Sequence, residues 1–276
     1  MDTLALTGSP FPFGLTFVPQ DVLAPLSGTT DDPVAALTEA CRVLGASFAF
    51  VPADAPSADA VIDALASTGV APMRAISGPL WPVIERRGVL DGLRATLTHP
   101  GDIGAELDQG LDAIVREAAH GVGAGARAIV LAEDLAGVDG PLVAPDFAIA
   151  ELLPRYDRIV RTARALGVPA IFHSDGDIRP LLPAIHRAGF VAVHAGGGLG
   201  LTGFERLFWA ARDEGIAVIG GLLTSELGNA ARAEMLGSSI GVLAKAGGLF
   251  VADDGGLTTV AEAGNLVTAL AAARDT

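Results

Sequence analysis

The chain has 276 residues, half of them hydrophobic, and a formal net charge of −14. Its length suits one large domain spanning residues 1–276, and the negative charge argues against nucleic acid or anionic lipid as a partner. Every apolar run falls far short of the ~20 residues of a membrane-spanning helix. The first twelve residues lack the basic start of a secretory signal, so we expect a cytoplasmic location without membrane association.

Short apolar runs rich in Val, Ile and Phe alternate along the chain with helical patterns. Such alternation is typical of parallel strands joined by crossover helices. The predicted strands are 13–18, 48–51, 73–77, 126–132, 169–173, 191–194, 216–220 and 249–252. A doubly wound open sheet would show the same alternation, but eight strands is the number that closes a barrel. We therefore predict an α/β fold with a single (β/α)₈ TIM barrel.

Helical patterns fill the intervals between these strands. The predicted helical segments are 33–44, 58–67, 83–121, 145–166, 179–188, 203–214, 227–246 and 259–273. Within the longest segment, the pair His99-Pro100 predicts that one helix ends and another begins, because proline cannot continue a helix.

Polar residues follow the predicted strands at their C-terminal ends, where the active sites of such barrels lie. They are Ser77, Glu133, Asp134, His173, Asp175, His194, Asp253 and Asp254. Several carboxylates at one mouth raise each other's pKa values, which can produce a general acid. We predict catalytic roles for Glu133, Asp134, His173 and Asp175.

Substrate binding is assigned to four further residues on or near the strands. Ser77, His194 and Asp253 stand at strand ends, although His194 could equally hydrogen-bond a neighbouring loop. Arg74 is the one strand-associated arginine in the first half of the chain and could hold a substrate carboxylate.

A metal ion is the other way to relieve the repulsion between these carboxylates. His173 and Asp175 form an H-x-D pair, and Glu133 or Asp253 could complete the ligand set. One imidazole with carboxylates suits a harder ion than zinc. The single cysteine, Cys41, falls in a helical pattern and is interpreted as part of the core.

Several stretches resemble the uroporphyrinogen decarboxylase superfamily. They include Glu133-Asp134 and the residues through Pro145, 153–156 (Leu-Pro-Arg-Tyr), and 171–178 (Ile-Phe-His-Ser-Asp-Gly-Asp-Ile). This superfamily comprises the haem-pathway decarboxylase and barrel methyltransferases that move methyl groups between corrinoid proteins, thiols and methyl donors. The resemblance implies a TIM barrel, a small-molecule substrate and, for the methyltransferases, a corrinoid (cobalamin) on a partner protein.

The chain departs from both groups of this superfamily. The decarboxylase carries an Arg-rich N-terminal segment that holds its anionic substrate, whereas residues 1–41 here contain no Arg. The thiol-activating methyltransferases have His-x-Cys and a later Cys as zinc ligands, where this chain has Asp175 and no second Cys. Members that act on methoxy or methylamine donors need only acid catalysis, which Asp175 or Glu133 could supply.

The leading hypothesis is therefore methyl transfer from a small donor to a corrinoid partner. Asp175 or Glu133 would act as general acid, His173 would orient it, and Asp134 and Asp253 would shape the pocket. One alternative is a decarboxylase or lyase that uses Asp134 as acid and Arg74 to hold a carboxylate. Another is a non-catalytic barrel that binds a ligand.

Overall fold

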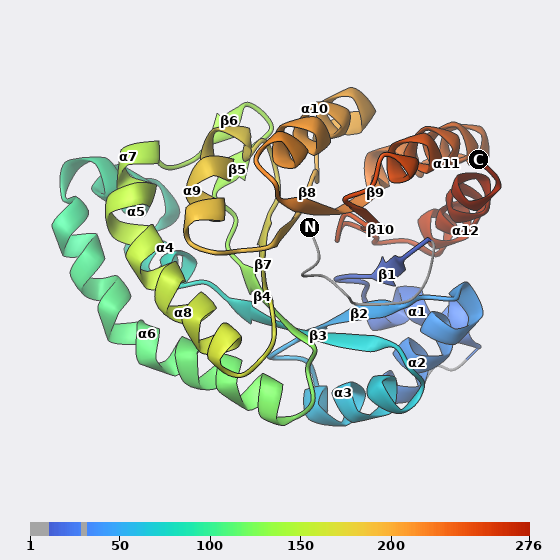
Figure 1. Ribbon diagram of the computed structural model, residues 1–276, viewed down its shortest axis with the longest axis horizontal. Helices are drawn as coiled ribbons and strands as arrows, with labels where there is room; N and C mark the ends of the chain where they lie inside the picture. Colours follow the sequence, from blue (N-terminus) through green and yellow to red (C-terminus); the bar gives the residue numbers. More distant parts are fainter. Residues whose placement is uncertain (1–10, 29–31) are drawn as a thin grey trace.

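The computed structural model describes residues 11–28 and 32–276, and within them eight parallel strands close into a barrel. Around the barrel the order is β1-β10-β9-β8-β7-β4-β3-β2, so the predicted closure is confirmed. Figure 1 shows the strands at the centre and the helices around the outside. The strands are β1 (Phe13–Leu15), β2 (Phe48–Pro52), β3 (Ala71–Ser77), β4 (Ala128–Ala132), β7 (Ala170–Ser174), β8 (Ala192–Ala195), β9 (Ala217–Leu222) and β10 (Leu249–Asp253).

Helices connect these strands and cover their outer face. They are α1 (Gln20–Ser27), α2 (Pro33–Leu44), α3 (Ala58–Ser67), α4 (Leu80–Arg87), α5 (Val89–Thr98), α6 (Pro100–Gly123), α7 (Pro145–Phe147), α8 (Leu153–Ala165), α9 (Leu182–Arg187), α10 (Gly200–Asp213), α11 (Ala230–Lys245) and α12 (Val260–Asp275). A π-helical turn, Ala148–Leu152, joins α7 to α8, and 3₁₀ turns, Arg179–Leu181 and Thr224–Glu226, precede α9 and α11.

Two features of the helical layer differ from the sequence prediction. The predicted break at His99-Pro100 is confirmed, but the same stretch also breaks at Gly88, which has φ +82° and separates α4 from α5. Helix α1 and a small antiparallel hairpin, β5 (Ala136–Gly137) with β6 (Gly140–Pro141), were not predicted. These elements are too short to give a clear hydrophobic period.

Side chains alternate between two apolar cores along each barrel strand. An inner core fills the barrel and includes Phe50, Met73, Val130, Ile171 and Ile219. The residues between them, on the other face of each strand, join the outer core beneath the helices. This alternation fixes which polar residues at the strand ends face the barrel axis and which face the helices.

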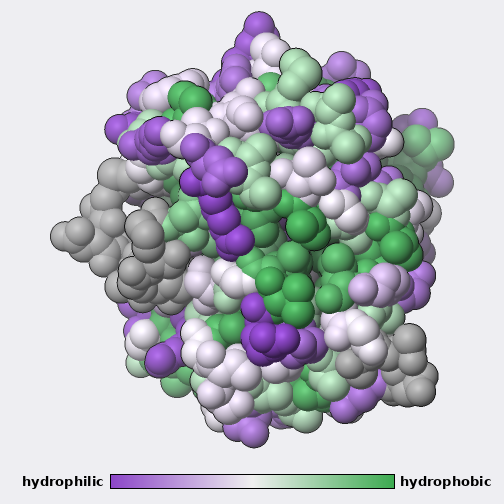
Figure 2. Space-filling view, turned by 90° about the vertical axis from the view of Figure 1, so that its right-hand side faces the viewer, coloured by the Kyte–Doolittle hydropathy of each residue, from purple (hydrophilic) through white to green (hydrophobic). Residues whose placement is uncertain are grey.

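The outer surface carries some exposed apolar side chains over the C-terminal helices. Met235 and Val242 on α11 and Val260 and Val267 on α12 are all exposed. Figure 2 views the side on which these helices lie and shows apolar side chains gathered near its middle. Over residues 11–28 and 32–276, no helix combines the length and the apolar character needed to cross a bilayer.

Candidate active site at the C-terminal ends of the strands

At one end of the barrel, the residues that continue the inward-facing positions of the strands are polar, and their side chains form a cluster. Asp134 lies four residues beyond inner-core Val130, and His173 and Asp175 lie two and four residues beyond Ile171. They meet in a pocket with a volume of about 250 Å³. Its walls include Phe17, Trp81, Asp134, His173, Asp175 and Asp254.

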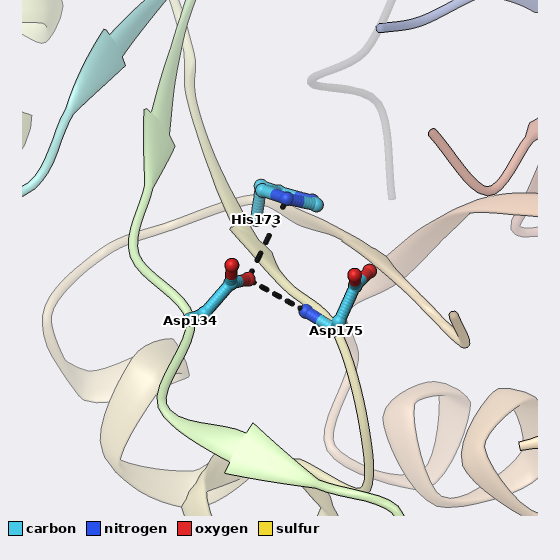
Figure 3. Close-up of side chains that lie close together, drawn as sticks. All are labelled: Asp134, His173 and Asp175. Carbon is cyan, nitrogen blue, oxygen red and sulfur yellow. Dashed lines mark hydrogen bonds and ion pairs between the residues drawn. The ribbon is translucent and has the colours of Figure 1, made fainter. Parts of the chain in front are cut away.

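Asp134, His173 and Asp175 form the centre of this pocket (Figure 3). One carboxylate oxygen of Asp134 accepts a hydrogen bond from the backbone N–H of Asp175 at 3.0 Å. The same oxygen lies 3.7 Å from Nε2 of His173. The Phe17 ring packs on the His173 imidazole, with the ring centroids 4.9 Å apart. The three polar groups therefore face one small space from two neighbouring strands, β4 and β7.

A hydrogen-bond chain below the pocket fixes the protonation of His173. His173 and His194 are register partners on β7 and β8, and their Nδ1 atoms lie 2.7 Å apart. Nε2 of His194 lies 3.0 Å from the backbone carbonyl of Asp253, which can only accept, so this nitrogen carries the hydrogen. Burial lowers the pKa of both rings, which keeps them neutral.

The tautomers follow from this chain. Since Nε2 of neutral His194 carries the hydrogen, its Nδ1 must accept, and Nδ1 of His173 must donate to it. Nε2 of His173 is then left with a lone pair, and this atom lies 3.7 Å from a carboxylate oxygen of Asp134. His173 thus presents an acceptor to the pocket, and His194 holds it in that state.

The electrostatics of the pocket favour protonation of one carboxylate. Partial desolvation raises the pKa of Asp175 to about 6, and the carboxylates of Asp134 and Asp254 add to the rise by repulsion. Gly197 leaves room for this carboxylate, because a Cβ there would lie 2.3 Å from Oδ1 of Asp175. Asp175 is therefore the side chain of this pocket best suited to deliver a proton near neutral pH.

The same three side chains form the set best placed to hold a metal ion. One ligand atom from each of Asp134, His173 and Asp175 lies within 4.8 Å of the others. The set contains no thiolate, since Cys41 is buried in α2. It does not fit the thiolate zinc site that the resemblance implies for the thiol-activating methyltransferases, and it suits a harder ion.

Glu133 lies away from the pocket, contrary to the expectation of a catalytic or metal-binding role. It falls in the outward phase of β4 and is 1% exposed. Its carboxylate accepts hydrogen bonds from the backbone N–H groups of Leu80 and Trp81 and from the Tyr156 hydroxyl. Burial raises its pKa to about 7 despite these bonds. Glu133 thus holds the start of α4 against the strand.

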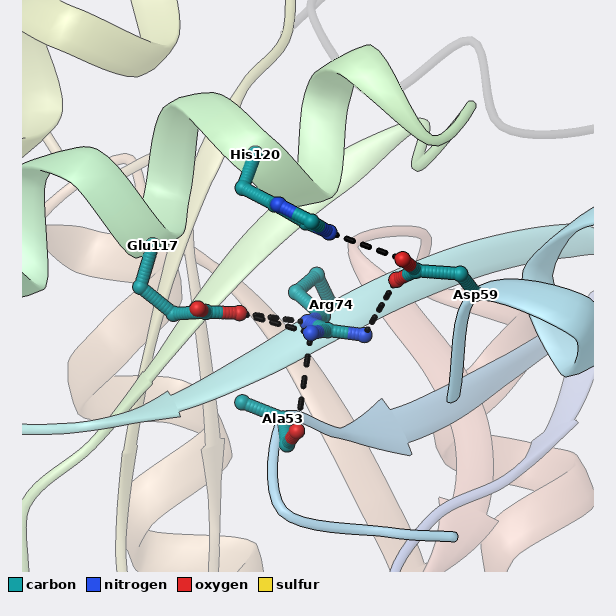
Figure 4. A network of polar contacts seen from close by, with 5 residues as sticks. All are labelled: Ala53, Asp59, Arg74, Glu117 and His120. Carbon is teal, nitrogen blue, oxygen red and sulfur yellow. Dashed lines mark hydrogen bonds and ion pairs between the residues drawn. The ribbon is translucent and has the colours of Figure 1, made fainter. Parts of the chain in front are cut away.

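Arg74 also faces away from the pocket, so it is not placed to hold a substrate carboxylate there. It lies between inner-core Met73 and Ala75, and its side chain extends outward toward α6 and α3 (Figure 4). The Arg74 side chain is 4% exposed, and its guanidinium bonds to Glu117 at 2.6 Å and to Asp59 at 3.3 Å. These contacts tie β3 to the surrounding helices.

The remaining predicted binding residues occupy different positions around the mouth. Asp253 is fully buried and accepts hydrogen bonds from Thr16, through its backbone N–H and its hydroxyl, and from the Gly255 N–H. It joins β10 to the segment after β1 and does not line the pocket. Ser77 is exposed at the end of β3 and lines a neighbouring pocket of about 320 Å³. His194 acts from below, through His173.

Three pocket residues were not among the predicted site residues. Phe17 follows β1 and packs on His173. Trp81 is the second residue of α4 and donates its indole N–H to the backbone carbonyl of Asp134 at 2.7 Å. Asp254 follows inner-core Ala252 by two residues and is held by the Thr224 backbone N–H at 3.0 Å. The alternation along β10 was the available signal for Asp254, whereas no local pattern pointed to the two aromatic residues.

Comparison with known proteins places this arrangement in a familiar fold. No protein-family model matches the chain, and no curated protein matches it. Among solved structures, it is similar to a methyltransferase from Methanosarcina mazei, with a TM-score of 0.68 and 17% identity over 97% of this chain and 92% of that one. A D-psicose 3-epimerase has a TM-score of 0.61 and 12% identity over 96% and 99% of the two chains.

An AP endonuclease of family 2 from Brucella melitensis is a third neighbour, with a TM-score of 0.53 and 10% identity over 92% and 96% of the two chains. The chain shares the barrel fold of these enzymes. At such identities the likeness concerns the fold alone, because this barrel serves many unrelated reactions. The chemistry therefore has to be argued from the pocket.

Proposed function

We propose that this chain is an enzyme of the uroporphyrinogen decarboxylase superfamily that moves a methyl group from a small donor to a corrinoid on a partner protein. The observation that carries the proposal is the position of Asp175. It stands in the pocket beside Asp134 and Asp254, and it faces the acceptor nitrogen of His173. The sequence resemblance supports the same class, and the barrel fold shared with the methyltransferase from Methanosarcina mazei is compatible with it.

In this reaction the bond between the methyl carbon and a nitrogen or oxygen of the donor breaks. The bonding electron pair stays on the heteroatom, which takes the proton of Asp175 as the methyl group leaves. Asp134 and Nε2 of His173 accept hydrogen bonds from the donor molecule and orient it. The corrinoid, held by the partner, supplies the nucleophile that receives the methyl group.

Because the mechanism needs protonated Asp175, the reaction rate should depend on pH. Because its pKa is raised to about 6, a usable fraction of Asp175 stays protonated near neutral pH, and that fraction falls as the pH rises. The decarboxylase alternative has less support, because Arg74 points away from the pocket and is engaged by Glu117 and Asp59.

The test is methylation of a reduced corrinoid by candidate methylated amines and methoxy compounds. We expect the wild-type chain to catalyse it and the Asp175→Asn variant, with an unchanged circular dichroism spectrum, to lose at least about a hundredfold in rate. Full activity of the variant would remove Asp175 from the acid role. Carbon dioxide release from a carboxylated substrate without a corrinoid would favour the decarboxylase alternative.

A further inference from the structure

The pocket offers hydrogen-bond acceptors almost exclusively. Asp134, Asp175 and Asp254 contribute carboxylates, and none of the described residues that line the pocket is Lys or Arg. Trp81 also lines the pocket, but its indole N–H is already engaged by the backbone carbonyl of Asp134. A ligand that fits must therefore bring its own donors or positive charge, and an anionic group would meet repulsion.

His173 gives a second and independent indication of such a ligand. Its side chain is nine-tenths buried, with the residue only 8% exposed, and its Nδ1 is used by His194. Within the described part of the chain, Nε2 makes no hydrogen bond and faces the Asp134 carboxylate at 3.7 Å. The Asp134 side chain is about half exposed, and its oxygen already accepts from the Asp175 N–H, so the site is open to a ligand and Nε2 of His173 is its free acceptor. A ligand N–H that lies between the two groups can donate to both of them.

Aromatic rings form two walls of the same space. Phe17 and Trp81 both line the pocket with the carboxylates. The face of an aromatic ring attracts a cation, and the attraction strengthens where water is excluded. Rings combined with carboxylates suit an ammonium group that carries carbon substituents better than a hydrated metal ion, which gains little from contact with a ring.

An apolar chamber lies on the other side of Phe17. It has a volume of about 290 Å³, and among residues 11–28 and 32–276 no titratable side chain lines it. Its walls include Phe17, Leu23, Leu37, Phe50, Ala55 and Val61. An apolar cavity of about 150 Å³ is large enough to hold benzene, so this chamber has room for an aryl or short alkyl group. Phe17 is thus shared by a space for charge and a space for hydrocarbon.

We propose that the substrate of this site is an organic ammonium ion whose nitrogen lies among Asp134, His173 and Asp175 and whose apolar substituent enters the chamber beyond Phe17. The inference rests on the proposed function for the reaction, since it names the class of methyl donor. Binding itself does not depend on the reaction. The N–H of the ligand donates to Nε2 of His173, which has no other donor among the described residues, and adds to the bond that the Asp134 carboxylate already accepts from the Asp175 N–H.

The experiment is titration calorimetry on the full chain without a corrinoid. The probes are N,N-dimethylbenzylamine, which is a cation at neutral pH, uncharged benzyl methyl ether, anionic phenylacetate, and trimethylamine as a cation without the aryl group. We expect the benzylamine to bind at least about tenfold more tightly than the ether and than trimethylamine, and phenylacetate not to bind. Equal binding of amine and ether would overturn the ammonium assignment.

Two alanine variants test the chamber. Ala55 lies in the loop after β2 and lines the chamber, so Ala55→Phe fills the space with little disturbance of the barrel. Ala66→Phe places the same ring on an exposed position of α3 and serves as the control. We expect Ala55→Phe to weaken the benzylamine at least about tenfold and trimethylamine far less. An unchanged benzylamine affinity would overturn the role of the chamber.

Metal analysis of the same preparation gives a further decisive outcome. A stoichiometric divalent ion that is lost in Asp175→Ala would assign the pocket to a metal and overturn the ammonium proposal. Failure of the proposed function is distinguishable from failure of this inference. Tight ammonium binding without methyl transfer contradicts the function only, whereas methyl transfer from methoxy donors without ammonium binding contradicts the inference only.

Discussion

Glu133 offers a direct test of the distinction between a structural and a catalytic carboxylate. Its two oxygens receive the Leu80 and Trp81 backbone N–H groups and the Tyr156 hydroxyl, all buried or partly buried beneath α4. Glu133→Gln keeps one oxygen for the two N–H groups, and its new amide can donate to Tyr156. Glu133→Ala removes every partner and leaves a cavity.

The expected costs differ between the two variants. At about pH 5, where the buried carboxyl is still protonated, each N–H left without a partner costs about 1–3 kcal/mol, so Glu133→Ala should lose about 3–5 kcal/mol of unfolding free energy. Glu133→Gln should remain within about 1 kcal/mol of the wild type under the same conditions. Both variants should retain the pocket chemistry, because Glu133 lies outside it.

The pH dependence of this difference has a definite sign. The folded-state pKa of Glu133 is raised to about 7 from an ordinary value of 4.5, so its contribution to stability is full below the ordinary pKa and is lost as the pH rises through the folded one. The amide introduced by Glu133→Gln does not titrate. Between about pH 5 and about pH 8, this variant should therefore gain about 2–3 kcal/mol relative to the wild type.

The assay is equilibrium unfolding in urea, followed by far-ultraviolet circular dichroism at several pH values. A stability difference between Glu133→Gln and the wild type that does not change with pH would refute the raised pKa. A strong loss of methyl transfer in Glu133→Gln, with stability unchanged, would refute the structural role and show that Glu133 takes part in catalysis.

Three further substitutions separate the pocket from its supports. Gly197→Ala places a Cβ against the Asp175 carboxylate and should reduce activity at least about tenfold with little loss of stability. Gly228→Ala is the control, because a Cβ at that position meets no other atom, and it should leave activity and stability unchanged in the same assays. Arg74→Met should lower the unfolding free energy by about 1–3 kcal/mol, a figure discounted because its partners are partly exposed, and leave KM unchanged in steady-state kinetics. His194→Phe removes the acceptor that fixes the tautomer of His173 and should reduce kcat by at least about tenfold, with a shifted pH profile and little change in KM.

Each of these has an opposing result. An active Gly197→Ala variant would show that the carboxylate of Asp175 need not occupy its position against the loop after β8. A raised KM in Arg74→Met would mean that the guanidinium reaches the substrate. An unaltered pH profile in His194→Phe would show that the hydrogen-bond chain below the pocket does not control His173.

The barrel was predictable because its strands are short apolar runs buried on both faces. All eight predicted runs overlap the observed strands, and the predicted segments 33–44 and 58–67 coincide with α2 and α3. The hairpin of β5 and β6 was not predictable, because each of its strands has two residues and leaves no periodic pattern, and it is held by a contact with the loop after β7.

The position of the candidate site at the strand ends could be predicted, but the residues that line its pocket could be predicted only in part. Position at a strand end does not distinguish Glu133 from Asp134 or Asp253 from Asp254. Glu133 faces the helices and Asp253 a neighbouring loop, whereas Asp134 and Asp254 line the pocket. Because side chains alternate along a strand, every second residue counted from an inner-core residue faces the barrel axis, and this alternation separates the members of each pair. The same alternation predicts that Arg74, next to inner-core Met73, faces the helices. Phe17 and Trp81 reach the pocket through loop and helix geometry, which the sequence does not reveal.

The measurement that tests the central claim most directly is the single-turnover rate of methyl transfer to a reduced corrinoid as a function of pH, in the wild type and in Asp175→Asn. If Asp175 delivers the proton, the wild-type rate falls about tenfold per pH unit above an apparent pKa near 6, and the variant is slow and insensitive to pH. A wild-type rate that does not change across this range, or a variant that matches it, would contradict the account.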